Sequence, residues 1–433
     1  MGFKIISPGV NDMLFLRNNA TLVNCDLEVE PPQVEGTISF IDAFRQGKGV
    51  IMDQGPATVQ EVNYQGGANG FLIEDETAGD ILLDGVAVSA EANGIVIDNP
   101  VGIITEPLPV VTGSITIRNA QATAFGLIPD RASDLIFVDS LHHHVNIEGG
   151  FLEGGRNGIE VGKGRDVIID GLRVQNTQEF NIVFDETFDR AIVRNVHLSR
   201  SKEDFCLYVF GPNSERDFAV PALRDVEMEN ILCTRSANGG VETEAATNVI
   251  AKNIVAVNNG FKFSDLRERR VGVSMGFAKS LVMENIFSAN NGDFGIVAAH
   301  NGIDGGETPT VEAHNLVSLD HPAGIGIVLG GKDHLQFRGF PENVQQISVN
   351  RFENILTDAG NFPVFGLPDA DDDEEDDNAG KGATRKRKRK RKLQKDPSGD
   401  ITVDGNTAKD FLVEGAVITS ASNVVAVSCP FFE

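Results

Sequence analysis

The sequence predicts an all-β protein, a right-handed parallel β-helix whose short strands wind into a solenoid of roughly 10–12 coils behind an irregular N-terminal cap. Composition is the first reason, since 46 Gly with two Tyr and no Trp suit many short strands joined by tight polar turns. Length is the second, because 433 residues exceed what one globular core usually holds. A recurring pair of short phrases is the third reason.

Residues 1–80 show little periodicity and contain Pro31, Pro32 and Pro56. We expect an N-terminal cap or attachment region, with a short helix over residues 41–46. The first 18 residues interrupt their apolar side chains with polar ones, so no signal-peptide core or membrane span is predicted.

The first recurring phrase is a polar residue, then Asn or Gly, then an aliphatic residue. Its middle residues are Gly171, Asn195, Asn230, Asn253, Asn285, Asn315 and Asn354, with weaker examples at Gly85, Asn119 and Gly149. From Gly171 onward they are 23 to 39 residues apart, the length of one coil plus variable loops. Asn tolerates left-handed backbone, and its amide can bond its neighbours above and below. The Asn row therefore predicts a structural ladder through a β-helix over residues 81–366.

The second phrase follows about ten residues later and has a small or turn residue before alternating apolar positions. It begins at Gly158, Asn181, Gly240, Gly260, Gly295 and Gly324. Alternation with a period of two turns one side chain inward and the next outward. Each coil is thus expected to add a strand of about three to five residues that stacks on its neighbours.

The combination of Asn turns and Gly-aliphatic strands resembles the pectate-lyase-like β-helix superfamily, over residues 80–366 and 400–433. The resemblance implies a β-helix fold and contact with carbohydrate. It carries over no catalytic residue, because the Gly-His-Gly motif of polygalacturonases is absent and a chain without Trp lacks the Trp-containing motif of pectate lyases.

Residues 367–399 interrupt the repeat with two charged blocks. Eight of the nine residues 369–377 are acidic, and residues 385–392 are all basic. Blocks of like charge repel themselves, so we expect a disordered loop. The basic run also leaves open a nuclear-import signal, a nucleic-acid contact or a protease processing site. The repeat resumes afterwards, so residues 400–433 are predicted to form the last coil and a C-terminal cap.

The net charge of −26 belongs to the folded body rather than to that insertion. Removing the nine acidic and ten basic side chains of residues 367–399 from totals of 63 and 37 leaves 54 acids and 27 bases. Such a surface disfavours nucleic acid, apart from the basic run at 385–392, and disfavours anionic membrane. The four cysteines are far apart in sequence and form no CxxC pair, so we expect buried free thiols.

Outward positions of the second phrase form rows across neighbouring coils, which lie about 4.8 Å apart. One row is expected to contain Glu160, Val183, Tyr208, Glu242, Lys262 and Val297, and the next Gly162, Asp185, Phe210, Glu244, Ser264 and Ala299. Carboxylates one coil apart would be about 5 Å apart and those two coils apart about 10 Å, which covers both geometries of glycoside hydrolysis. The expected catalytic residues are Glu244, Asp265 and Asp185.

The same rows supply residues for holding a sugar. The expected substrate-binding residues are Tyr208, Phe210, Glu242, Lys262 and His300. Adjacent outward aromatics are typical of stacking surfaces, and Lys262 would act as a base in a lyase or hold an acidic sugar. A solvated charged face without chemistry is the alternative.

No metal or cofactor is expected. In His142-His143-His144 alternation turns the middle side chain away from the other two, so this run cannot complete a metal site. Asp185, Glu186 and Asp189 supply oxygens that suit Ca²⁺, without a loop of defined spacing.

Two functions follow. The first is a protein of the cell surface or of a virus particle that binds a polysaccharide along its exposed strand face. Cleavage is left open, and a glycoside hydrolase or a polysaccharide lyase are the catalytic options. The alternative is a non-enzymatic structural or adhesive protein, which contacts other virion or surface proteins. Proteins of this shape often form homotrimers, but no coiled-coil segment enforces one here. The location expected is extracellular, without a recognisable signal peptide.

Overall fold

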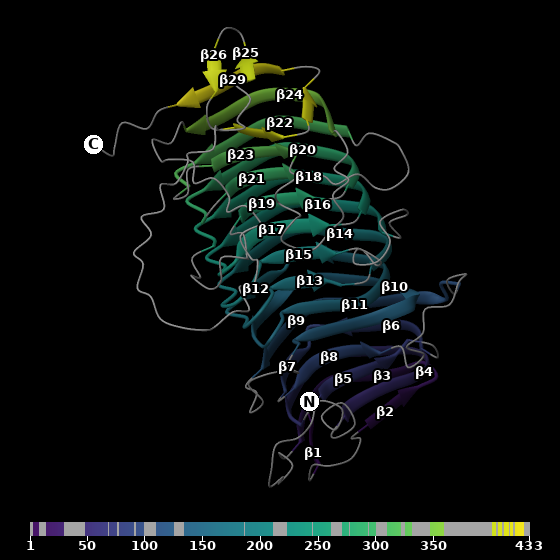
Figure 1. Cartoon of the computed structure of the whole chain (residues 1–433). Helices are drawn as coiled ribbons and strands as arrows, with labels where there is room; N and C mark the ends of the chain where they lie inside the picture. Colours follow the sequence, from purple (N-terminus) through teal and green to yellow (C-terminus); the bar gives the residue numbers. More distant parts are fainter. Residues whose placement is uncertain are drawn as a thin grey trace, which may run out of the picture.

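The computed structural model is an all-β structure, and no helix occurs among the residues it describes. It describes residues 3–7, 14–29, 48–67, 69–75, 78–90, 92–98, 110–124, 134–185, 187–210, 223–244, 246–260, 271–276, 278–292, 294–299, 310–321, 325–330, 347–358, 401–403, 406–408, 411–414, 416–418 and 421–427. Figure 1 shows the strands stacked along one axis, from β1 beside the N-terminus to the yellow strands of the C-terminal part.

The strands fall into two columns, and one short strand with the long strand that follows it makes a layer. The short-strand column contains β2 (Leu14–Arg17), β5 (Asn69–Glu74), β8 (Asn93–Asp98), β13 (Ile182–Phe184), β15 (Leu207–Phe210), β17 (Gly239–Glu244), β19 (Val271–Gly276), β21 (Phe294–Ala299), β23 (Ile325–Gly330) and β27 (Phe411–Glu414).

The long-strand column bends between two faces. It contains β1 (Phe3–Ser7), β3 (Ala20–Val29), β6 (Ala78–Asp84), β7 (Ala87–Ala90), β9 (Gly113–Ala124), β12 (Arg173–Gln175), β14 (Thr187–Ser199), β16 (Leu223–Thr234), β18 (Ala246–Val257), β20 (Ala278–Ala289), β22 (Thr310–Leu319), β24 (Ile347–Asp358), β28 (Ala416–Ile418) and β29 (Ala421–Val427). Three strands run through both columns, β4 (Lys48–Gly66), β10 (Ile136–Gly154) and β11 (Ile159–Asp170).

Pairing is parallel throughout both columns. In the short-strand column β13 pairs with β15, which pairs with β17, and in the long-strand column β14, β16, β18, β20 and β22 pair in succession. Among the described strands β25 (Ile401–Val403) and β26 (Asn406–Ala408) make an antiparallel pair. Successive layers therefore place equivalent residues side by side along the whole stack.

One hydrophobic core runs through the stack from Leu16 to Ile327. Alternation produces it, because along β16 Val226, Met228, Ile231 and Cys233 are buried while most of the residues between them face outward. Each fully buried aliphatic side chain contributes about 1.5–3 kcal/mol relative to exposure, and a single layer could not bury its own apolar side.

The predicted Asn row is confirmed. Eleven consecutive layers place a residue with φ between 51° and 73° at the bend of the long strand, namely Asn24, Glu61, Gly85, Asn119, Gly149, Gly171, Asn195, Asn230, Asn253, Asn285 and Asn315. From Asn230 to Asn315 each side-chain amide donates to the side-chain oxygen of the Asn in the layer before it, over 2.7–2.9 Å, and the series ends at Asn195, which accepts from Asn230. Left-handed backbone and the amide chain together explain the choice of Asn.

The parallel stack begins earlier than predicted. Strands β1 to β5 lie within residues 1–80, expected as a cap, and pair in parallel as later strands do. The bend of β4 has Glu61 with a φ of 51°, where other layers have Asn or Gly, so the phrase is missing from the sequence there. The helix predicted at residues 41–46 lies outside the described residues.

One predicted strand was misplaced. The phrase at Gly260 was expected to provide a strand with Phe261 and Phe263, but the strand that pairs with β17 is β19, ten residues later. Gly272-Val273-Ser274-Met275 fits the same phrase, so local pattern alone does not choose between the two candidates. Residues 261–270 lie outside the described part of the chain.

The prediction of free thiols was wrong for two cysteines. Cys206 and Cys233 form a disulfide, with Cα atoms 6.0 Å apart, whereas Cys25 is buried and free. Spacing in sequence did not indicate the bond, because its partners lie 27 residues apart and meet only when a complete layer closes. Cys429 and the charged insertion at 367–399 lie outside the described residues, and β27 to β29 extend the parallel stack into the predicted last coil.

Candidate functional site

The outward row on the short-strand face is continuous across the middle layers. Register places Phe137 beside Glu160, Glu160 beside Val183, Val183 beside Tyr208, Tyr208 beside Glu242, Glu242 beside Ser274, and Ser274 beside Val297. The order of the predicted row therefore holds except at one member, where Ser274 stands instead of Lys262, but Val183, Glu242, Ser274 and Val297 are buried rather than exposed.

Tyr208 is the centre of an aromatic cluster. Its ring centroid lies 5.7 Å from Phe180, 5.8 Å from Phe205 and 5.7 Å from Phe210, and the Phe180 and Phe210 rings stack on it. Phe180, Tyr208 and Phe210 are half-buried, whereas Phe205 is buried. Half-buried aromatic rings that lie side by side present apolar surface suited to contact with a sugar ring. We call these four residues the aromatic cluster.

Two predicted carboxylates lie next to this cluster but are not on an exposed face. Glu242 and Glu244 have 2% of their surface exposed. The Tyr208 hydroxyl donates to Oε2 of Glu244 over 3.2 Å, and the Ser274 hydroxyl donates to Oε1 of Glu242 over 3.4 Å. In the structure these two carboxylates are therefore hydrogen-bond acceptors inside the protein.

Of the other predicted site residues, one lies in the described part of the chain and three lie outside it. Asp185 is exposed and follows β13, where its backbone N–H donates to the carbonyl of Val161 over 2.9 Å. Asp265, Lys262 and His300 lie outside the described residues. The structure therefore brings together Tyr208, Phe210, Glu242 and Glu244, with Asp185 one layer below them.

Sequence reasoning missed Phe180 and Phe205. Each lies two residues before the start of its short strand, directly ahead of an inward-facing residue, Asn181 or Cys206. An aromatic residue at this offset in two adjacent layers was the available signal.

A carboxyl pair lies on the same side of the stack, with Glu160 three layers and Asp134 four layers below Glu242. Asp134 is buried, and burial first and the Glu160 carboxylate second hold the pKa of Asp134 well above its usual range. Glu160 also accepts from the Asn157 amide over 2.6 Å and lies 3.7 Å from Arg156, which pairs with Glu179 over 2.8 Å. Asp134 thus stays protonated where an ordinary Asp is charged.

A second polar cluster fixes the corner that follows the short strand of β10. The Asp75 carboxylate accepts from the Ser140 hydroxyl over 2.5 Å, from Nδ1 of His143 over 2.7 Å, and from the backbone of Leu141 and His142. Burial by itself raises the pKa of Asp75, and these hydrogen bonds outweigh it, so the pKa lies below its usual range. The arrangement is structural, since neither Asp75 nor His143 has an exposed side chain.

The histidine run behaves as alternation predicted. His143 points inward, while His144 has a half-exposed side chain that pairs with Asp166 over 2.6 Å. Among the described residues no cluster of His, Cys, Asp and Glu is suited to a metal ion. Of the oxygens considered for Ca²⁺, Asp189 is engaged by Arg165 over 2.9 Å and by Arg224 over 3.7 Å, and Glu186 lies outside the described part.

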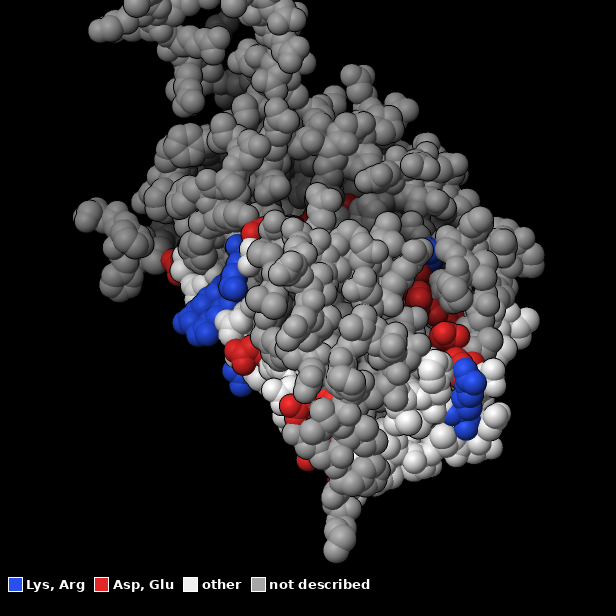
Figure 2. All heavy atoms as spheres, turned by 90° about the horizontal axis from the view of Figure 1, so that it is seen from below, with Lys and Arg blue, Asp and Glu red and all other residues white. Residues whose placement is uncertain are grey.

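Charge on the long-strand faces is largely paired across layers. Examples are Arg118 with Glu148, Arg190 with Asp166, and Arg194 with Asp170, at 2.8–3.0 Å. Seen from below, Lys and Arg side chains lie close to Asp and Glu side chains at the edges of the described surface (Figure 2). These faces therefore present both positive and negative charge rather than charge of one sign.

Comparisons with known proteins assign neither a family nor a function to the chain. No family model, no curated protein and no solved structure matches the chain. No helix within the described ranges is long and apolar enough to cross a membrane.

Proposed function

We propose that the chain is a right-handed parallel β-helix of the pectate-lyase-like kind that binds a polysaccharide along its short-strand face. The observation that carries the proposal is the aromatic cluster, in which Tyr208 stacks between Phe180 and Phe210 above the carboxylate of Glu244. The rings come from two adjacent layers, about 4.8 Å apart, so a saccharide chain lying across these layers would contact both.

The proposed location is the cell surface or a virus particle. The Cys206–Cys233 disulfide supports it, because structural disulfides form and persist in oxidising surroundings and are rare in reducing cytosol. An acidic surface would also keep such a protein soluble and apart from nucleic acid.

Binding rather than cleavage is the function that the described geometry favours. Glu242 and Glu244 are almost fully buried and already accept hydrogen bonds, which suits carboxylates that hold a surface in place. Hydrolysis would need an accessible acid within reach of the bound chain, and Asp185 is the exposed candidate among the described carboxylates near the cluster.

A structural or adhesive role is the second candidate. The Asn chain from Asn195 to Asn315 and the single continuous core favour it, since together they make a stiff stack whatever its surface binds. The two candidates differ in one respect, because an adhesive protein that contacts only other proteins would bind no saccharide.

The test is a glycan array followed by affinity measurements on any saccharide that binds. We expect Tyr208→Ala and Phe210→Ala to raise the Kd at least about tenfold, because truncating a central aromatic contact commonly costs that much. Phe151→Ala is the matched control, since Phe151 is a half-buried aromatic on the long-strand face that packs under Arg173. Equal losses in all three variants, or no binding to any saccharide, would contradict the proposal.

Cleavage is examined on the same saccharides. Product formation that disappears in Glu244→Gln or Asp265→Asn, with binding retained, would add catalysis to the proposal. Unchanged cleavage in both variants would remove these two residues from it.

A further inference from the structure

In the short-strand column, the position just ahead of the first aligned buried aliphatic residue is cramped and lies in the interior. In five layers it is Gly158, Cys206, Gly240, Gly272 or Gly295, one residue ahead of an aligned buried aliphatic residue. A Cβ at Gly158 would lie 2.2 Å from Cγ1 of Val174, and one at Gly272 would lie 2.2 Å from Oγ of Ser288. This position therefore faces the inner row of the long strands at very close range.

Cys233 is the member of that inner row which faces Cys206. Register aligns Leu198, Cys233, Ala256 and Ser288 in successive layers. The disulfide joins the two rows directly and encloses one layer of the stack, since its partners lie 27 positions apart in the sequence. In the layer above, Gly240 and Ala256 occupy the equivalent positions without a bond.

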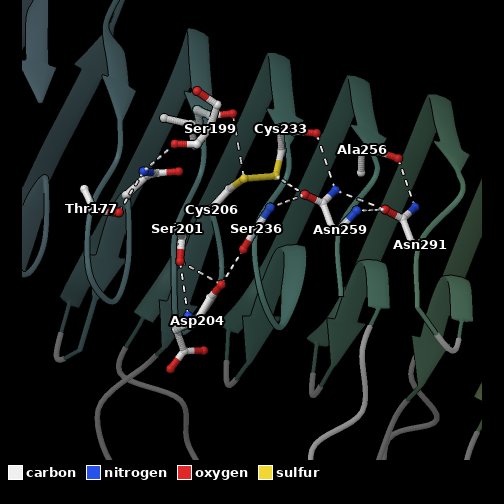
Figure 3. The surroundings of a disulfide bond; sticks show 12 residues. Thr177, Ser199, Ser201, Asp204, Cys206, Cys233, Ser236, Ala256, Asn259 and Asn291 are labelled. Carbon is white, nitrogen blue, oxygen red and sulfur yellow. Dashed lines mark hydrogen bonds between the residues drawn. A yellow bond between two sulfur atoms is a disulfide. The ribbon is translucent and has the colours of Figure 1, made fainter. Parts of the chain in front are cut away.

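Polar contacts hold the chain on both sides of the disulfide (Figure 3). Asn259 accepts from the backbone of Ser236 over 2.9 Å and donates to Asn291 over 3.0 Å, which fixes the interior next to Cys233. On the other side the Ser201 hydroxyl donates to the carbonyl of Asp204 over 2.8 Å, and the Ser236 hydroxyl donates to the same carbonyl. The turn that leads into β15 is thus fastened to the following layer.

Phe205 lies between these two attachments. Asp204 before it is held by Ser201 and Ser236, and Cys206 after it is held by the disulfide. The ring centroid of Phe205 lies 5.8 Å from that of Tyr208, so Phe205 packs against Tyr208. A shift at Cys206 would be transmitted through Phe205 and through the first residues of β15 to Tyr208.

We infer that the Cys206–Cys233 disulfide is a positioning element that fixes Phe205 and Tyr208 in the geometry required for saccharide binding. The inference rests on the proposed function and adds that the bond acts on the binding surface beyond adding stability. Preorganised surfaces lose less conformational freedom on binding, so loosening this one would weaken affinity.

The test replaces both cysteines by the residues of the layer above, as Cys206→Gly with Cys233→Ala, in a Tyr64→Phe background. The chain has no Trp and only two Tyr, so Tyr208 is then the single tyrosine that reports. Acrylamide quenching of its fluorescence measures how well its neighbours shield it, whereas its intensity would also change because the disulfide itself is removed. Leu83→Ala is the control, a core truncation in β6 that lowers overall stability far from β15.

Positioning predicts that the double variant stays folded by far-UV circular dichroism at 25 °C, yet its Tyr208 is quenched more easily and its Kd rises at least about tenfold. Leu83→Ala would keep the wild-type quenching of Tyr208 and the wild-type Kd, although its Tm would fall by a comparable amount. If the double variant loses Tm while quenching and Kd match those of Leu83→Ala, the disulfide only stabilises and the inference is wrong.

Two further outcomes are separable. If the wild-type protein binds no saccharide, the proposed function fails, and the quenching comparison alone decides whether the disulfide positions Tyr208. If the double variant does not fold, the Tyr64→Phe protein reduced with TCEP, with its thiols counted by mass spectrometry, provides the same quenching and affinity comparison. Unchanged quenching and affinity after verified reduction would overturn the inference.

Discussion

The hydroxyl of Tyr208 on β15 donates a hydrogen bond to Oε2 of Glu244 on β17, 3.2 Å away in the next layer. Glu244 is almost completely buried, so the bond links a half-exposed ring to a carboxylate inside the protein. The contact fixes the rotation of the ring at the centre of the aromatic cluster. The hydroxyl and the ring of Tyr208 therefore contribute differently, and substitutions can remove one without the other.

Tyr208→Phe removes the hydroxyl and keeps the ring. We expect the free energy of unfolding to fall by about 1 kcal/mol, because a buried carboxylate loses a donor. Affinity for a bound saccharide should change less than in Tyr208→Ala, which also removes the stacking surface. Urea unfolding and a binding titration of both variants provide the comparison, and equal affinities in the two would show that the ring does not contact the saccharide.

Asn253 tests the ladder at the bend of the long strands. It has a φ of 53°, donates to Asn230 over 2.9 Å and accepts from Asn285 over 2.8 Å. Asn253→Gly loses the two hydrogen bonds but suits left-handed backbone, whereas Asn253→Ala loses the same bonds and leaves in that backbone a residue that tolerates it less well, at a cost of about 1–2 kcal/mol. Denaturant unfolding should therefore rank wild type above Gly and Gly above Ala. An Ala variant as stable as Gly would argue against left-handed strain as the reason for Asn.

Asp134 predicts an unusual dependence of stability on pH. Its folded pKa is raised, so above the pKa of an unfolded Asp, about 3.9, the folded state holds a proton that the unfolded state has lost. Stability contributed by this group is present at lower pH and declines as pH rises toward the folded pKa. Asp134→Asn mimics the protonated form, so at pH 8 it should be at least about 1 kcal/mol more stable than wild type.

The control for that measurement is Asp225→Asn, at an exposed aspartate on β16 whose Oδ1 accepts from Asn248. Its unfolding midpoint should follow the wild-type pH profile. A wild-type profile with no decline from pH 4 to 8, or an Asp134→Asn variant that follows the same decline, would refute a protonated Asp134.

A substitution at Gly239 tests whether Phe205 supports Tyr208, and it leaves the disulfide intact. A Cβ at this position would lie 2.2 Å from Cε1 of Phe205, so Gly239→Ala must displace the ring. We expect easier quenching of Tyr208 and weaker saccharide binding, with the disulfide still present by mass spectrometry. Gly85→Ala serves as comparison, because its φ of 64° makes it a strained substitution at the bend of a distant layer. If both variants leave Tyr208 equally shielded, Phe205 does not support it.

The sequence was informative wherever one backbone requirement selects one residue type. Left-handed backbone at the bend selects Asn or Gly, so Asn195 to Asn315 could be aligned in advance, and alternation then placed Tyr208 next to Glu242. At Glu61 the same backbone occurs without its usual residue, so the phrase does not identify that layer.

Contacts across the interior could not be predicted in this way. Cys206 and Cys233 meet because their layer closes on itself, and no local pattern encodes which inward residues face one another. Lys262 and Ser274 both follow a Gly-apolar pair, and only the pairing of β17 with β19 selects Ser274. Burial of Glu242 and Glu244 also depends on what lies over the strand face, which alternation does not describe.

The most direct test of saccharide binding at the aromatic cluster is a titration of the Tyr64→Phe variant with a saccharide identified on an array. The fluorescence of Tyr208 is the signal that reports binding. Binding at the aromatic cluster predicts a saturable change with the same Kd that an independent calorimetric titration gives, and no change with a saccharide that the protein does not bind. Calorimetric binding with an unresponsive Tyr208 would place the saccharide elsewhere on the molecule and would contradict binding at the aromatic cluster.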